Sequence, residues 1–135
     1  MIKTVVFVCI HNYGRSQMAE AFFNQSTKGK AIGISAGTQP GDEVNPIVVK
    51  AMREVGIDIS RNKPKTMTLE ILSKADKMIT MGCGADARGL CPASFIETED
   101  WALEDPEGKS LEQVRIIRDE IKKRVLKLNQ DIIPE

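Results

Sequence analysis

The chain has 135 residues, 41% of them hydrophobic, and its 19 basic and 19 acidic residues leave no formal net charge. This length predicts a single domain over residues 1–135, and the balanced charge argues against a nucleic-acid partner. The apolar run Val5–Ile10 is too short to cross a membrane, and no signal-peptide pattern precedes it. We therefore expect a cytoplasmic protein without a membrane partner, whose three cysteines are in a reducing compartment.

The first half of the chain alternates between strand and helix patterns. Thr4–Val8 is rich in β-branched residues and predicts a buried strand, and Ser16–Gln25 follows it as a helix with one apolar face. Ala31–Ala36 predicts a second strand. The pair Asn45-Pro46 is typical of a helix start, and Gly56 marks the end of that helix.

The second half continues the alternation. Thr68–Lys74 predicts a short helix, Lys77–Met81 a third strand and Phe95-Ile96 a fourth. Ser110–Gln113 fits a capping box. The helix after it presents apolar residues at helical spacing, namely Val114, Ile117, Ile121, Val125 and Leu128. Alternating strands and helices predict an α/β fold with a parallel sheet, whose ligands bind beyond the carboxyl ends of the strands.

The loop between the first strand and the first helix carries most of the predicted chemistry. Its backbone N–H groups can surround a tetrahedral oxyanion, and Arg15 can hold two of the oxyanion's oxygens. Cys9 is then placed to attack the central atom, and the Ser16 hydroxyl can donate to its thiolate. The predicted oxyanion-binding residues are Ile10, His11, Asn12, Tyr13, Gly14 and Arg15. The alternative is a buried cysteine that ends a strand beside an unrelated arginine.

Individual loop residues have separate expected roles. Gly14 permits close approach of the backbone to the ligand, and Asn12 tolerates left-handed dihedral angles. Tyr13 is expected at the mouth of the pocket. His11 is the only histidine of the chain and is assigned no catalytic role, and we predict no metal site.

Transfer of an oxyanion also needs an acid that protonates the departing oxygen. Asp105 is the favoured candidate, because Pro106 restrains its backbone toward an extended conformation. Glu104 and Asp100 are the competing carboxylates. Taken alone, an Asp-Pro pair usually marks only a turn.

Cys83 and Cys91 suggest which oxyanion is bound. Their spacing fits no usual zinc pattern, and taken alone they are equally well explained as inert thiols. Phosphorus(V) on a thiolate cannot be reduced by a second thiol, whereas arsenic(V) can. A thiol–arsenate adduct on Cys9 could therefore be resolved by Cys83 and then by Cys91 through thiol–disulfide exchange.

With these residues the chain resembles the thioredoxin-coupled arsenate reductases, which share the fold of the low-molecular-weight tyrosine phosphatases. Gln17 follows Ser16 as in the reductases, where phosphatases typically have proline, and Glu107-Gly108 follows Asp105-Pro106 in place of tyrosines. The resemblance implies a four-stranded parallel sheet in the flavodoxin-like order 2-1-3-4, with helices on both faces. It extends over residues 8–21, 35–37, 45–46, 51–55, 58–60, 83–92, 101–108 and 114–125.

The resemblance also implies the roles of the site residues. Cys9 is the nucleophile, Arg15 and Ser16 support the oxyanion and the thiolate, and Asp105 is the general acid. Cys83 and Cys91 are the resolving pair, although their spacing is one residue longer than in the family. Arsenate is the expected substrate, phosphate or sulfate its mimics, and thioredoxin the external reductant of a monomer.

Some members of this family bind a potassium ion. Asn12, Glu20 and Ser35 match three of its ligands, but Lys65 takes the place of the fourth, an aspartate. We therefore expect neither a tight potassium site nor another tightly bound cofactor. Two other hypotheses remain: a phosphatase that uses Cys9, Arg15 and Asp105, and a redox sensor without enzymatic activity.

Overall fold

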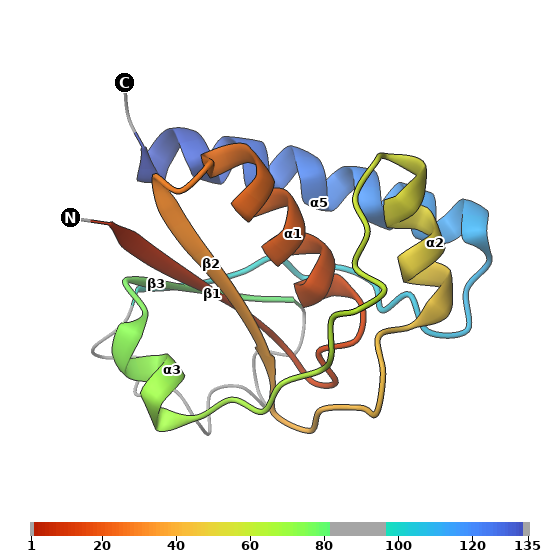
Figure 1. Cartoon of the computed structure of the whole chain (residues 1–135), viewed down its shortest axis with the longest axis horizontal. Helices are drawn as coiled ribbons and strands as arrows, with labels where there is room; N and C mark the ends of the chain where they lie inside the picture. The colour runs from red at the N-terminus through yellow and green to blue at the C-terminus, as the bar shows by residue number, and fades with distance from the viewer. Residues whose placement is uncertain (1, 82–96, 134–135) are drawn as a thin grey trace.

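The computed structural model describes residues 2–81 and 97–133, which form a four-stranded parallel sheet in the order β2-β1-β3-β4 (Figure 1). β1 (Lys3–Cys9) lies between β2 (Ala31–Gly37) and β3 (Lys77–Thr80). β4 (Glu97–Asp100) forms one edge. The predicted α/β class and strand order are confirmed. The residues Phe95-Ile96, where the fourth strand was expected, lie outside the described residues, and β4 begins directly after them.

Helices cover both faces of the sheet, as expected. α1 (Arg15–Thr27), α2 (Pro46–Glu54) and α5 (Leu111–Ile132) share one face, and α3 (Leu69–Lys74) packs on the other (Figure 1). Successive side chains of a strand point to opposite faces. Val5, Phe7 and Cys9 of β1 accordingly join the larger core with α1 and α5, and Val6 and Val8 join the smaller core with α3. Cys9 is the last odd-numbered residue of β1.

The helix boundaries agree with their sequence signals. The Asn45 side chain accepts a hydrogen bond from Ile47 N at 3.1 Å and thereby caps α2. Ser110 and Gln113 form the predicted capping box at the start of α5. The five apolar residues predicted for the inner face of this helix are all buried. Among the helices in residues 2–81 and 97–133, none combines the length and apolar composition that a membrane span requires.

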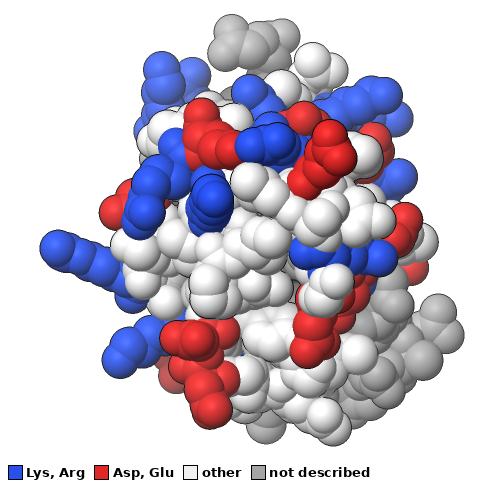
Figure 2. All heavy atoms as spheres, turned by 90° about the vertical axis from the view of Figure 1, so that its right-hand side faces the viewer, with Lys and Arg blue, Asp and Glu red and all other residues white. Residues whose placement is uncertain are grey.

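An ion-pair cluster joins α2 to α5. Glu54 at the end of α2 contacts Arg115 Nη2 at 2.6 Å and Arg118 Nη1 at 2.9 Å, and Arg118 also donates to the Ala51 carbonyl oxygen. Hydrogen bonds from Arg115, and then from Arg118, hold the pKa of Glu54 at about 2 against an ordinary value of 4.5. On the face shown in Figure 2, acidic and basic side chains are interspersed around an uncharged centre.

We expect the contribution of Glu54 to stability to depend on pH in a defined window. Because its folded-state pKa is lowered, the stabilisation is complete above about pH 4.5 and is lost as the pH falls toward about 2. Urea unfolding at a series of pH values should show that Glu54→Gln costs less stability as the pH falls through this window. Glu70→Gln is the control, because it removes only an exposed pair with Lys74. A cost of Glu54→Gln that does not change with pH would contradict the assignment.

Candidate active site

Cys9 lies at the carboxyl end of β1, where the sheet order predicts a ligand site. The residue is 2% exposed, and its Sγ atom lies 2.9 Å from Ser16 Oγ and 3.2 Å from the backbone N–H of Asn12. The structure therefore brings the predicted nucleophile and the predicted serine together.

The N-terminus of α1 is the second component of the site. Gly14 is its N-cap residue and provides no side-chain cap, whereas α2, α3 and α5 of the described part all begin with a capped turn. The first N–H groups of a helix have no partner within the helix and readily bind anions. The uncapped turn of α1 follows directly on the loop that was predicted to bind an oxyanion.

Asn12, in the middle of this loop, stabilises the loop conformation. Its φ of 53° is in the left-handed region, as expected from the sequence. The side-chain amide donates from Nδ2 to Ser16 Oγ at 2.7 Å and accepts at Oδ1 from the backbone N–H of Lys65 at 2.7 Å. Asn12 therefore fixes the loop to the first turn of α1 on one side and to the segment at Lys65 on the other.

Two glycines allow neighbouring segments to pack closely against the loop. A Cβ atom on Gly14 would lie 2.8 Å from Pro106 Cγ, so glycine here allows close contact with the segment that carries Asp105. Sequence reasoning related Gly14 only to ligand approach and did not include this contact. Gly37 pairs with Cys9 across β1 and β2, and a Cβ atom there would lie 2.7 Å from the Ile10 carbonyl oxygen. Both positions exclude a side chain because backbone or ring atoms already fill the space.

Arg15 connects three parts of the site. The side chain is nearly buried, and Nη1 donates to the carbonyl oxygens of Met81, beyond β3, and of Leu103, at 2.8 Å to the latter. Nη2 lies 3.8 Å from Asp105 Oδ2. The backbone carbonyls thus fix Nη1 of the guanidinium, and the Asp105 carboxylate lies beside Nη2.

Of the three candidate acids, Asp105 is the one beside Arg15. Its Oδ1 accepts from the backbone N–H of Glu107 at 2.9 Å, and its side chain is 40% exposed. Glu104 pairs with Lys109 at 3.1 Å, and Asp100 accepts from Thr80 Oγ1 at 2.7 Å within the sheet. The geometry favours Asp105 over both competitors.

Comparison with known proteins gives the family. Residues 4–135 match the low molecular weight phosphotyrosine protein phosphatase family. The chain belongs to this family. An arsenate reductase of Bacillus cereus is 36% identical over 130 residues, which are 95% of each chain.

Two solved structures add to this relation. An arsenate reductase in a phosphate-binding state superposes with a TM-score of 0.86 at 39% identity and covers 97% of this chain and 99% of its own. A thioredoxin-dependent arsenate reductase of Corynebacterium glutamicum superposes with a TM-score of 0.81 at 34% identity. That alignment covers 97% of this chain, which spans only 62% of the Corynebacterium protein.

In this member of the phosphatase family, a groove of about 530 Å³ opens beside Tyr13. The other residues that line it are Gly41, Asp42, Glu43, Asn45, Pro46, Glu107 and Gly108. Burial, and then a hydrogen bond with Glu107, raises the pKa of Tyr13, so its phenol stays protonated. The His11 ring lies tilted against the Tyr13 ring, with their centroids 4.9 Å apart, and its Nδ1 contacts the Gln39 carbonyl oxygen, so His11 supports the position of Tyr13.

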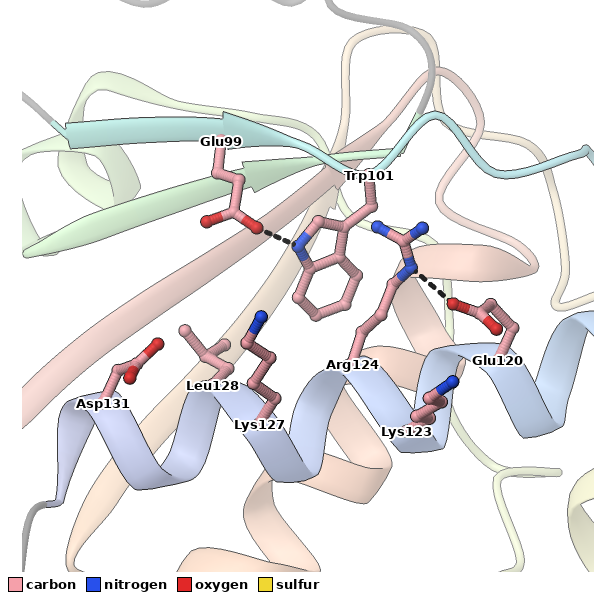
Figure 3. A pocket seen from close by; sticks show the side chains of 8 residues that line it. All are labelled: Glu99, Trp101, Glu120, Lys123, Arg124, Lys127, Leu128 and Asp131. Atoms are coloured by element: carbon pink, nitrogen blue, oxygen red, sulfur yellow. Dashed lines mark hydrogen bonds and ion pairs between the residues drawn. The ribbon is translucent and has the colours of Figure 1, made fainter.

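A second cavity, of about 460 Å³, lies between β4 and α5 (Figure 3). Trp101 Nε1 donates to Glu99 at 2.7 Å, and Arg124 Nε donates to Glu120 at 2.8 Å. The other lining residues are Lys123, Lys127, Leu128 and Asp131. None of the eight residues belongs to the predicted site. Because the lining contains both acidic and basic side chains, it favours neither an anionic nor a cationic ligand.

Cys83 and Cys91 lie outside the described residues. The backbone before them is described as far as Met81, whose N–H donates to the Val8 carbonyl oxygen at 3.1 Å. Met81 is therefore next to the site, because it binds Val8, the residue before Cys9, and because its carbonyl oxygen accepts from Arg15. Cys83 follows Met81 by two residues.

Proposed function

We propose that this protein reduces arsenate to arsenite through Cys9, Cys83 and Cys91. The observation that carries the proposal is the geometry around Cys9. Its buried thiol, hydrogen-bonded to Ser16 and Asn12, lies beside the uncapped N-terminus of α1. Two further cysteines in the chain and the named arsenate reductases among its relatives support arsenate over phosphate as substrate.

The proposed reaction balances with three thiols and no metal. The Cys9 thiolate attacks arsenic, an As–O bond breaks, and the departing oxygen takes a proton from Asp105. The Cys83 thiolate then attacks Cys9 Sγ, the S–As bond breaks, and its electron pair remains on arsenic, which leaves as arsenite. Cys91 attacks Cys83 and releases Cys9 as a thiolate. Two electrons have passed from two thiols to arsenic, and a Cys83–Cys91 disulfide remains.

We assign re-reduction of this disulfide to thioredoxin. The similarity to the thioredoxin-dependent enzyme of Corynebacterium glutamicum supports this choice, as does the need for a dithiol reductant. The protein is expected to work as a monomer in the cytoplasm.

The decisive experiment counts thiols in a single turnover. Arsenate is added to the fully reduced protein without any external reductant, and the thiols are counted by mass spectrometry. We expect the loss of two thiols for each arsenite released, with the disulfide located at Cys83 and Cys91. Absence of oxidation would refute the reductase and favour the alternative.

The alternative is a phosphatase that acts through a phosphorylated Cys9. It is favoured by the position of Asp105 beside Arg15, since an acid and an arginine are what hydrolysis of a phosphate ester requires in addition to Cys9. This chemistry needs neither Cys83 nor Cys91. The same site can therefore hydrolyse esters weakly while its main reaction is reduction.

The residues at the family's potassium position do not fit a cation. Lys65 Nζ lies 3.4 Å from Glu20 Oε2 and 3.5 Å from Ser35 Oγ, and Ser35 Oγ donates to Glu20 Oε1 at 2.8 Å. The ammonium group is next to the oxygens that a potassium ion would need, and its charge repels a second cation. We propose that Lys65 supplies the positive charge at this position.

We therefore expect the rate of arsenate reduction to be the same in potassium chloride and in sodium chloride of equal ionic strength. The steady-state rate over a range of both salts is the measurement. Lys65→Met is the informative variant, because it leaves Glu20 without its ammonium partner and should make the rate depend on potassium. Strong activation of the wild-type protein by potassium alone would contradict this assignment.

A further inference from the structure

Gln17 is a fully buried polar residue that the proposed reaction does not use. It stands in the first turn of α1 directly after Ser16, and it is 0% exposed. Burial of an amide is costly unless its donors and acceptor are satisfied. The partners of this amide therefore indicate what the residue does at this position.

The amide of Gln17 is bonded both to the oxyanion loop and to the segment Asn62-Lys63. Nε2 lies 3.1 Å from the carbonyl oxygen of Asn12, 3.2 Å from Asn12 Oδ1 and 3.2 Å from the Lys63 carbonyl oxygen. Oε1 accepts from Asn62 Nδ2 at 3.3 Å. Two of the three acceptors belong to the one loop residue with a left-handed backbone, and the rest of the amide is held by the segment from Asn62 to Lys65.

The contact with the Asn12 carbonyl fixes a peptide plane. The C=O and N–H of a trans peptide point in opposite directions, so holding the carbonyl also sets the direction of the next N–H. That N–H belongs to Tyr13, a member of the predicted oxyanion loop. A positive φ at Asn12 is unfavourable for a residue with a side chain, and this contact stabilises it.

The contact with Asn12 Oδ1 extends to the nucleophile. The backbone N–H of Lys65 can only donate, so the Asn12 atom that faces it is the oxygen, and Nδ2 must face Ser16 Oγ. Ser16 Oγ then accepts from Asn12, which leaves its own proton available for donation to a Cys9 thiolate, whose Sγ lies 2.9 Å away. Gln17 reinforces this orientation by giving Oδ1 a second donor.

From these contacts we propose that Gln17 is a positioning residue, which acts through Asn12 on the oxyanion loop and on the hydrogen bond from Ser16 to Cys9. The inference deepens the proposed function, since it concerns capture of the oxyanion at the same site. The competing interpretation is that Gln17 only joins α1 to the segment 62–65 and affects stability alone.

The test uses inorganic phosphate as the probe and needs no arsenic chemistry. Iodoacetamide alkylates the reduced full-length chain, and the Cys9 peptide is followed by mass spectrometry with and without phosphate. For Gln17→Met we expect about tenfold more phosphate for half-protection and slower alkylation of Cys9 at neutral pH, because two hydrogen bonds to Asn12 are lost. Gln17→Glu has the same shape but no donor, and it should behave alike.

Thr27→Val is the matched control. It removes a buried hydrogen bond from Thr27, at the end of the same helix, to the Ala31 carbonyl at the start of β2, so it should lower the melting temperature and leave both Cys9 measurements unchanged. A lower melting temperature of Gln17→Met with wild-type protection and alkylation would overturn the proposal.

Asn62→Ala covers the case in which Gln17→Met does not fold. It removes only the donor to Gln17 Oε1, so a smaller weakening of phosphate protection, about twofold to threefold, is expected. No change in either measurement would overturn the proposal here too. If the wild-type protein binds phosphate but reduces no arsenate, the proposed function fails while the inference on Gln17 stands.

Discussion

Replacement of Cys83 by serine is expected to abolish arsenate reduction while hydrolysis of p-nitrophenyl phosphate stays within about threefold of the wild-type rate. The reason is the division of labour in the proposed reaction. Cys9, Arg15 and Asp105 suffice for transfer of an oxyanion to and from sulfur, whereas reduction requires a second thiol that attacks the Cys9 sulfur and lets arsenic leave as arsenite. Both rates are measured on the same preparation, with arsenite release as the reductase readout.

Two further cysteine variants serve as controls. Cys9→Ser should lose both activities, because both begin on this sulfur. Cys91→Ser should complete the first two steps and stop with a Cys9–Cys83 disulfide that mass spectrometry can locate. Equal loss of reduction and hydrolysis in Cys83→Ser would contradict the division of labour.

The second large effect is expected from Arg15→Lys, although it keeps the charge. The guanidinium donates to the Met81 and Leu103 carbonyls and still presents Nη2 beside Asp105. A lysine has one nitrogen and cannot hold these carbonyls and two oxygens of an oxyanion at once. We expect the rate of either reaction to fall by about 100- to 1,000-fold.

Steady-state kinetics and phosphate protection of Cys9 measure this effect together. Arg124→Lys is the matched control, because Arg124 forms a half-exposed pair with Glu120 on α5, far along the sequence from the loop. Its rates should equal those of the wild-type protein. Activity of Arg15→Lys within twofold of wild type would show that the several N–H donors of the guanidinium are not needed.

Much of the fold could be predicted because its signals are local. The apolar run before Cys9, the Asn45-Pro46 helix start and the capping box at Ser110 depend on neighbouring residues, and each appears at the expected position. The order of the strands came from the resemblance, because pairing between distant segments leaves no local pattern. The fourth strand was expected at Phe95-Ile96, whereas β4 begins after them and has acidic residues at three of its four positions on the sheet edge.

In the site, too, some contacts could be predicted from the sequence and others could not. The proximity of Cys9 to Ser16 and the left-handed Asn12 follow from a short segment and could be anticipated. The contacts of Arg15 with two backbone carbonyls could not, since a carbonyl oxygen has no residue-type signal. Gln17 was only a marker of subfamily in the sequence, because its burial depends on segments far along the chain.

Gly37 has a consequence for mutational tolerance. It contributes no donor, acceptor or charge from a side chain, and it belongs to the strand next to the nucleophile. A methyl group there would press on the Ile10 carbonyl and on Asn12, so even alanine must displace the backbone that encloses the oxyanion. In a saturation library screened for the proposed arsenate reduction, position 37 would therefore be as intolerant as Cys9 itself, for reasons of volume alone.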